Sequence, residues 1–413
     1  MLSRRGALLL AAGSFALLSP PVRRPPKAAP AVPPPVRPQL EALLTARSAA
    51  LLRRDGAALT ALAAPEAVPG ELTLLARLAE LPLAGLGYRL TGVGEPTVGG
   101  GESGAAVERV SATAELGYRV DGVDAHPALL GRRVEFVRSG GRWLLASDEP
   151  AGAVALWDLG AVRVVRGARS TVLGLGEPGE LAKTAALADH AVPAVSEVWG
   201  SGWAGRLLLE IPASEEQFAQ LLGVKAADYQ GIAAVTTAAT GPDGQSAADR
   251  VVLNPEAYAE LTDLGRRVVT THEATHVATR ADTRAWTPLW LSEGVADYTG
   301  YRSTGRTPRQ IAPELAKDVQ AGRLPAALPL DSDFTAGAVG IAQAYELGWS
   351  ACRLIAERYG EPRLTAFYRA AGAAGPTASR DQWLDGLLRA QLGVGLDAFV
   401  KEWVAELKRL FGG

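Results

Sequence analysis

The chain has 413 residues, of which 48% are hydrophobic and 21% are charged, with a formal net charge of −2. This length is sufficient for two or three domains with packed cores, and the composition excludes a largely disordered chain. The near-neutral charge argues against nucleic-acid binding, which usually needs a basic surface. The single cysteine, Cys352, excludes an intrachain disulfide and a cysteine-based zinc cluster.

The N-terminal segment has the pattern of an export signal. Arg4 and Arg5 precede an apolar run, which is too short for a membrane span of about 20 residues but suits a signal sequence. The Ser3-Arg4-Arg5 pattern is similar to a twin-arginine signal. We predict that residues 1–19 are an export signal or signal anchor. The protein is then extracellular or associated with the cell envelope, and this anchor is the one membrane attachment that we expect. Residues 20–38 contain nine prolines and predict an extended linker.

A small α+β module is predicted next, over residues 39–175. Apolar residues recur at helical spacing from Gln39 to Leu62. Alternating apolar and polar residues from Gly85 to Leu175 then predict antiparallel strands, with a hairpin turn at residues 139–142. Over residues 39–150, this order resembles the nuclear-transport-factor-two-like or cystatin-like modules that often precede secreted enzymes.

Residues 176–413 predict a second α+β domain. A helical pattern from Glu177 to Trp199 comes first. Three strands are expected after it, at Arg206–Ile211, Gly231–Thr237 and Asp249–Asn254. From Leu261 onward the pattern predicts helices at residues 263–281, 288–301, 308–322, 337–359, 361–373, 380–391 and 396–411. The expected fold class is therefore α+β throughout, with a small sheet above helices and a helical C-terminal lobe.

The sequence His272-Glu273-Ala274-Thr275-His276 matches the pattern H-E-x-x-H and lies in one of these helices. Side chains four residues apart on a helix project from one face, about 6 Å apart, so two imidazoles there can bind one metal ion. Glu273 lies on the same side, where it can hold a water molecule. A motif this short arises by chance at a low but real frequency, so the assignment needs a third ligand.

Glu293 supplies that ligand. It lies in the segment Trp290–Tyr298 on the next predicted helix, and sixteen residues separate it from His276, enough for the second helix to cross the first. Asp297, one turn further, can accept the free ring N–H of a ligating histidine. Two imidazoles and one carboxylate leave a fourth position open, which is the arrangement of a catalytic zinc site. We predict one Zn²⁺ per chain. Asp263 and Thr287 are expected to cap the two helices.

Together the two motifs, H-E-x-x-H and W-L-x-E-G-x-A-x-Y, resemble the gluzincin zinc metallopeptidases, in particular bacterial peptidase-MA-like domains, over about residues 180–411. The step from Glu293 to Asp297 is similar to that of thermolysin. The resemblance implies zinc ligation by His272, His276 and Glu293, with Glu273 as general base. It also implies zinc-dependent hydrolysis of peptide bonds, by a metal-activated water, in a peptide or protein substrate.

A further group is needed to stabilise the oxyanion of such a reaction. Tyr345 is the candidate, because related aminopeptidase-like gluzincins carry a tyrosine in a comparable helix; the alternative is a tyrosine that only packs its helix. Tyr298 and Tyr301 are further candidates. The aminopeptidase signature G-x-M-E-N is absent, since Met1 is the only methionine. Recognition of a free N-terminus of that kind is therefore not supported.

Two other functions stay open at this stage. The chain can be a catalytically silent extracytoplasmic binding protein that uses its N-terminal module, or a zinc hydrolase of a non-peptide amide, because the sequence does not define the pocket. The strand Gly231–Thr237 is either an ordinary sheet strand or an edge strand that pairs with an extended peptide. We expect ordinary structural roles for four other residues, Trp143, Trp157, His126 and His190.

Overall fold

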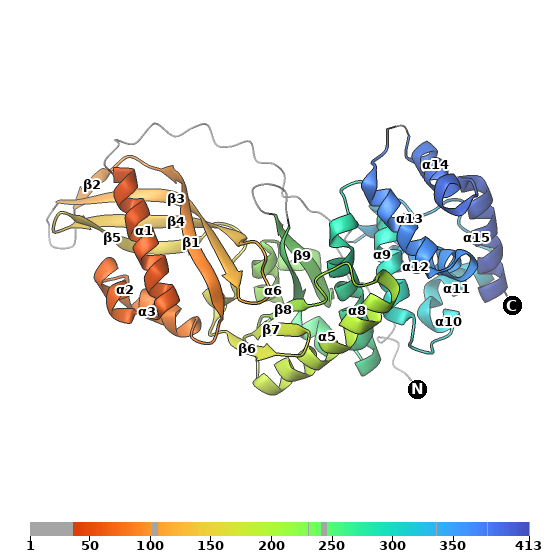
Figure 1. Cartoon of the computed structure of the whole chain (residues 1–413), viewed down its shortest axis with the longest axis horizontal. Coiled ribbons are helices and arrows are strands. Elements are labelled where there is room, and N and C mark those ends of the chain that lie inside the picture. The colour runs from red at the N-terminus through yellow and green to blue at the C-terminus, as the bar shows by residue number, and fades with distance from the viewer. Residues whose placement is uncertain are drawn as a thin grey trace.

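The computed structural model describes residues 36–100, 106–229, 231–240, 246–335, 337–377 and 379–412. The predicted export signal and residues 20–35 of the predicted linker lie outside the described residues. Among the described helices, none has both the length and the apolar character needed to cross a membrane. The chain forms an elongated molecule, with an N-terminal module at one end, a central sheet, and a helical lobe at the other end (Figure 1). The predicted α+β class is confirmed.

The N-terminal module consists of three helices packed on an antiparallel sheet. The helices are α1 (Val36–Arg53), α2 (Gly56–Leu62) and α3 (Val68–Arg77). The strands are β1 (Leu83–Val93), β2 (Thr97–Gly100), β3 (Ala106–Val120), β4 (Ala128–Ser139) and β5 (Arg142–Pro150), in the order β1-β3-β4-β5 with β2 beside β3. The predicted hairpin turn joins β4 to β5, and its residues Gly140 and Gly141 both have positive φ, as the tight turn requires. The single helix expected at Gln39–Leu62 is divided into α1 and α2. Asp55 caps the start of α2, because its side chain accepts a hydrogen bond from the backbone N–H of Ala58.

The central sheet contains β6 (Arg163–Arg166), β7 (Ser170–Gly174), β8 (Leu207–Ile211), β9 (Ala234–Thr240) and β10 (Ser246–Leu253). Its order is β6-β7-β8-β10-β9, so β9 lies at one edge. The segment of β6 and β7 was predicted to belong to the N-terminal module, and this prediction is wrong for these two strands. They pair with each other and, through β7, in parallel with β8. Alternation predicts a strand but does not identify its partner. The boundary predicted at residue 175 falls within the central sheet, between β7 and β8.

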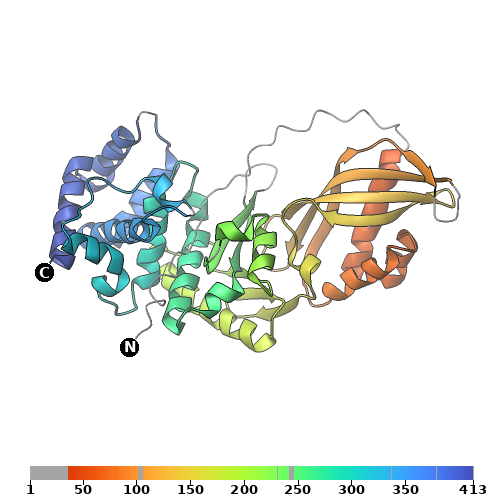
Figure 2. The same ribbon diagram turned by 180° about the vertical axis from the view of Figure 1, so that it is seen from behind.

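The two faces of the central sheet have different partners. Helices α5 (Pro178–Trp199) and α8 (Asp263–Thr279) cover one face (Figures 1 and 2). On β9 and β10, Ala234 and Val251 belong to the core formed with these helices, whereas Val235 and Val252 belong to a core shared with the N-terminal module. Successive side chains of a strand point to opposite faces. The N-terminal module therefore packs on the side of the sheet opposite the helix that carries the H-E-x-x-H motif.

A buried ion pair joins the two parts across this sheet. Arg250 on β10 donates from both terminal nitrogens to Asp124, at 2.9 and 2.7 Å, and Asp124 follows the end of β3. The guanidinium also lies 3.6 Å from Glu210 on β8 and 5.3 Å from the ring centre of Tyr118. Bidentate arginine–carboxylate geometry is specific as well as strong. The pair fixes how the N-terminal module sits on the sheet.

The helical lobe contains α9 (Leu289–Tyr301), α10 (Pro308–Ile311), α11 (Pro313–Gln320), α12 (Ile341–Tyr359), α13 (Glu361–Ala373), α14 (Arg380–Leu392) and α15 (Leu396–Phe411). Short helices α4 (Leu156–Leu159), α6 (Glu215–Leu222) and α7 (Pro255–Ala259) lie earlier in the chain. Both predicted helix caps are wrong. Thr262 caps α8 by accepting from the backbone of Gly265. Thr287 accepts instead from the backbone of Arg284, before α9 begins.

Candidate metal centre

The H-E-x-x-H motif lies in the buried middle of α8. His272 is 1% exposed, Glu273 0% and His276 7%. The buried hydroxyls of Thr271 and Thr275 are satisfied because each donates a hydrogen bond to the carbonyl one turn earlier. The sequence can therefore bury a helix rich in polar residues between the central sheet and α9.

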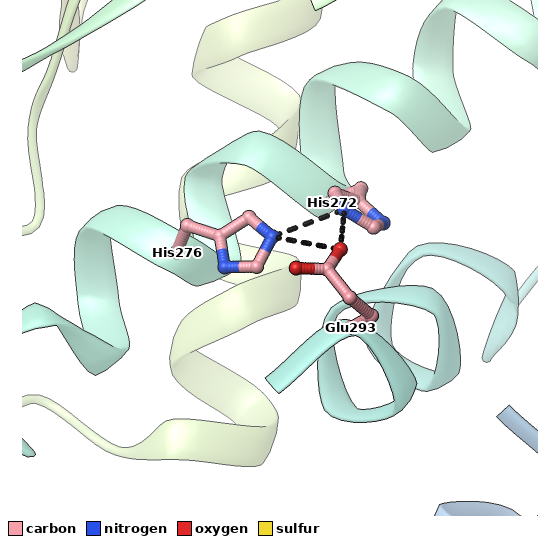
Figure 3. A group of neighbouring side chains, drawn as sticks. All are labelled: His272, His276 and Glu293. Carbon is pink, nitrogen blue, oxygen red and sulfur yellow. Dashed lines mark hydrogen bonds and ion pairs between the residues drawn. The ribbon is translucent and has the colours of Figure 1, made fainter. Parts of the chain in front are cut away.

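The two imidazoles of α8 meet the Glu293 carboxylate of α9 at one point (Figure 3). His272 Nε2 lies 3.0 Å from His276 Nε2 and 3.3 Å from Glu293 Oε2, and His276 Nε2 lies 3.5 Å from the same oxygen. The three predicted ligands thus form one compact triangle, as expected if the second helix crosses the first.

This triangle has the dimensions of three ligands around one ion. Tetrahedral zinc with bonds of about 2.0–2.1 Å separates its ligand atoms by about 3.3–3.4 Å. The distances of 3.0–3.5 Å fit that spacing. Neither oxygen of the fully buried Glu293 has a hydrogen-bond donor among the described residues. A buried carboxylate that faces two imidazole nitrogens, and has no hydrogen-bond donor among the described residues, is well satisfied by a cation. The residues present therefore fit zinc.

Asp297 orients the first of the two histidines. His272 Nδ1 lies 2.8 Å from Asp297 Oδ1. Burial acts to lower the pKa of His272, but the carboxylates of Asp297 and Glu293 outweigh it and hold that pKa well above its usual value in the protein alone. When Nδ1 donates to Asp297, Nε2 is the nitrogen left with a lone pair facing Glu293. This is the arrangement that the sequence spacing predicted.

The carboxylate of Glu273 is held from β9. Thr236 Oγ1 donates to Glu273 Oε2 at 2.6 Å, and both side chains are buried. The other oxygen, Oε1, has no hydrogen-bond partner among the described residues. Thr236 lies in the strand expected at Gly231–Thr237, but no motif marked it as a site residue. The alternation of that strand is the one sequence signal that placed it on the same face as Ala234.

Two further contacts near the site were also missed. Arg280, one turn beyond His276, forms a 2.7 Å ion pair with Asp249 of β10. The buried hydroxyl of Tyr368 on α13 lies 2.8 Å from Thr283 Oγ1, beyond the end of α8, and 3.3 Å from Ser292 Oγ, beside Glu293. These contacts join the two helices that carry the candidate ligands to the sheet and to the helical lobe. They connect segments far apart in the sequence, so no local motif indicates them.

Tyr345, the predicted oxyanion stabiliser, lies on α12 and is 4% exposed. Its ring packs edge to face on Phe334, with ring centres 5.2 Å apart. The alternative Tyr298 donates its hydroxyl to Glu361 at 2.6 Å, and Tyr301 is half-buried. Tyr345 packs its helix, and its role towards a substrate stays a prediction.

The four residues expected to have structural roles do lie outside the metal centre. Trp143 and Trp157 are 6% and 4% exposed and belong to the hydrophobic cores of the N-terminal part of the chain. His126 and His190 lie at the surface. Among the described residues, the cluster of His272, His276 and Glu293 is the one group of three metal-binding side chains that converges.

A scan against models of known protein families finds no match, and no curated protein matches the sequence. Similarity to solved structures is low. A mutant of a two-domain M1 zinc metallopeptidase bound to L-arginine shares 15% identity and a TM-score of 0.35 over 78% of this chain and 71% of that chain. A mutant M1 zinc metallopeptidase from Deinococcus radiodurans, bound to a Tyr-Ser-Ala substrate, shares 16% identity and a TM-score of 0.34, again over 78% of this chain and 71% of that chain. TM-scores at this level do not define an activity.

Proposed function

We propose that this protein is a zinc-dependent peptidase of the gluzincin type. The observation that carries the proposal is the triangle of His272 Nε2, His276 Nε2 and Glu293 Oε2, with edges of 3.0–3.5 Å, next to the buried carboxylate of Glu273. Three protein ligands with a free carboxylate beside them match a hydrolytic site better than a structural one, in which four protein ligands close the coordination sphere.

The chemistry divides between the metal and the protein. Zinc held by these three residues would polarise a substrate carbonyl and lower the pKa of a water molecule from about 15.7 to about 7. Glu273 accepts a proton from the attacking water as the new carbon–oxygen bond forms. It then donates that proton to the leaving amine as the carbon–nitrogen bond breaks. Asp297 keeps His272 in the tautomer that presents Nε2 to the site.

The position of β9 supports an extended peptide as the substrate. This strand lies at the edge of the central sheet, and its residue Thr236 contacts Glu273. A peptide that added to this edge by main-chain hydrogen bonds would run past Glu273. An amide without an extended backbone gains nothing from an edge strand, so we favour peptide over non-peptide substrates.

The decisive experiment compares the wild type with Glu273→Gln, using zinc content and the cleavage of fluorescein-labelled denatured casein. Both proteins are expected to contain one zinc per chain, but only the wild type should cleave casein. General acid–base catalysis contributes about 10²–10⁴-fold, so the variant should lose at least about 100-fold in rate. A zinc-loaded wild type without any cleavage would instead favour the binding-protein alternative. Full activity of Glu273→Gln would exclude the mechanism.

We also propose export of the protein, on the pattern of residues 1–19 alone. The test is a fusion of these residues to a reporter that is active only outside the cytoplasm, with Arg4 and Arg5 both changed to Lys as a control. An active reporter whose activity falls in the control supports a twin-arginine signal. An inactive reporter contradicts export.

A further inference from the structure

The hydroxyl of Thr236 makes a short hydrogen bond to the carboxylate that we assign as the general base. Thr236 Oγ1 lies 2.6 Å from Glu273 Oε2 and 3.2 Å from the backbone oxygen of the same residue. A hydroxyl has one proton to donate, and distances of about 2.5–2.7 Å are typical of a hydroxyl bound to an ionised carboxylate. The proton therefore goes to Oε2. Thr236 is 5% exposed, so water does not compete for it.

The two carboxylate oxygens of Glu273 are consequently different. Oε2 accepts from Thr236, whereas Oε1 is buried and has no hydrogen-bond partner among the described residues. Buried polar atoms are nearly always paired with protein or with ordered water. Oε1 is therefore the oxygen available to a water molecule or a substrate proton, and the bond at Oε2 limits rotation of the carboxylate.

Strand pairing fixes which residue of β9 contacts Glu273. Thr236 lies opposite Val251 of β10, and both face α8, whereas the next pair, Thr237 and Arg250, faces the N-terminal module. The bidentate hydrogen bond from Arg250 to Asp124 keeps the Arg250 side chain on the face of the N-terminal module, and so Val251 and Thr236 on the face of α8. A shift of one residue would turn the Thr236 side chain to the opposite face, so the pairing specifies the contact.

We infer that Thr236 is a positioning residue for catalysis, which orients Glu273 so that Oε1 accepts the proton of the attacking water. The inference rests on the proposed peptidase function and adds a residue to it. Thr236 does not touch the metal ligands in any described contact, and its effect should therefore appear in the rate of the chemical step and not in zinc binding.

The test uses three variants of the full chain. Thr236→Val removes the hydroxyl while keeping the branched shape, and Thr236→Ser restores a hydroxyl. Thr237→Val makes the same chemical change at the neighbouring position, on the opposite face of the strand. With denatured casein, Thr236→Val should lower kcat by about 10- to 100-fold, as expected when a catalytic group is misplaced. Its KM and zinc content should stay unchanged. The serine variant should recover most of kcat, and Thr237→Val should match the wild type.

A second readout does not depend on activity. Crystal structures of the zinc-free wild type and Thr236→Val should show the Glu273 carboxylate in one position in the wild type and rotated or divided between positions in the variant. If Thr236→Val does not fold, Thr236→Ala removes the same hydroxyl with less steric demand. A wild-type kcat in the variant without the hydroxyl, or a Glu273 carboxylate in its wild-type position, would overturn the role of Thr236 but not the proposed function. An inactive zinc-loaded wild type would overturn the proposed function as well.

Discussion

His272 Nδ1 and Asp297 Oδ1 lie 2.8 Å apart, on two helices that the sequence motifs predicted to cross. Carboxylates that accept from a ligating histidine typically strengthen metal binding by about 10–100-fold. We therefore expect Asp297→Ala to weaken zinc binding by that factor, measured by competition with a chromophoric chelator. Tyr298→Phe is the matched control, because its hydroxyl points to Glu361. Equal zinc affinity in Asp297→Ala and wild type would contradict this role.

Zinc should stabilise the fold through the same triangle. A ligand present at about 100 times its Kd stabilises the native state by about 2.7 kcal/mol. We expect a chelator to lower the Tm of the wild type, and zinc to restore it. In His276→Ala, which lacks one corner of the triangle, the Tm should respond weakly to either addition. A wild-type Tm that ignores both zinc and chelator would argue against the metal centre.

The close approach of α9 and α12 predicts an intolerant glycine beside the third ligand. A Cβ on Gly294 would lie 2.3 Å from the backbone oxygen of Gly348 and 2.7 Å from Cys352 Sγ. Gly294→Ala must push the helices apart, so we expect a loss of about 1–3 kcal/mol in unfolding free energy and weaker zinc binding. The control is Gly386→Ala on α14, where nothing lies within 4 Å. That change should stabilise by about 0.4–1 kcal/mol. Urea unfolding measures both.

The buried pair of Arg250 and Asp124 should behave differently from a surface pair. Removal of Asp124 takes away both short hydrogen bonds of the buried Arg250 and leaves it with the more distant Glu210 carboxylate at 3.6 Å, so Asp124→Ala should destabilise by about 3–5 kcal/mol. Changing both residues, Arg250 to Met and Asp124 to Leu, should recover much of the lost unfolding free energy. Arg138 and Glu108, an exposed pair at 3.0 Å, serve as the control, and Arg138→Ala should change stability by less than about 1 kcal/mol. A small effect of Asp124→Ala would show that the pair does not hold the module.

Glu346 should make stability depend on pH. Burial raises the pKa of this carboxyl from 4.5 to about 7, although the backbone N–H groups of Leu315 and Glu314 act in the opposite direction. The folded protein thus binds this proton more tightly than the unfolded chain. The resulting stabilisation is complete below about pH 4.5 and is lost as the pH rises to about 7. The difference in unfolding free energy between wild type and Glu346→Gln should therefore fall by about 1–3 kcal/mol between about pH 5 and pH 8. A difference in unfolding free energy that does not change with pH would contradict the raised pKa of Glu346.

The sequence by itself determined the spacing of the candidate metal ligands. Within one helix the rise and turn per residue are constant, so His272 and His276 must share a face, as must Glu293 and Asp297. The spacing of these residues is a local property, and the structure places all four as expected. The helical C-terminal lobe and the β4–β5 hairpin were predicted for the same reason.

Only the tertiary structure decided which segments meet. Alternation predicted the β6 and β7 strands but could not show that β7 pairs with β8, and no local pattern indicated that Arg250 of one part reaches Asp124 of the other. Thr236 is the clearest case, because its contact with Glu273 depends on the register of β9 against β10 and on the packing of α8 over both. These relationships arise from burial and pairing between segments far apart in the chain, where no fixed helical or strand period relates the residues.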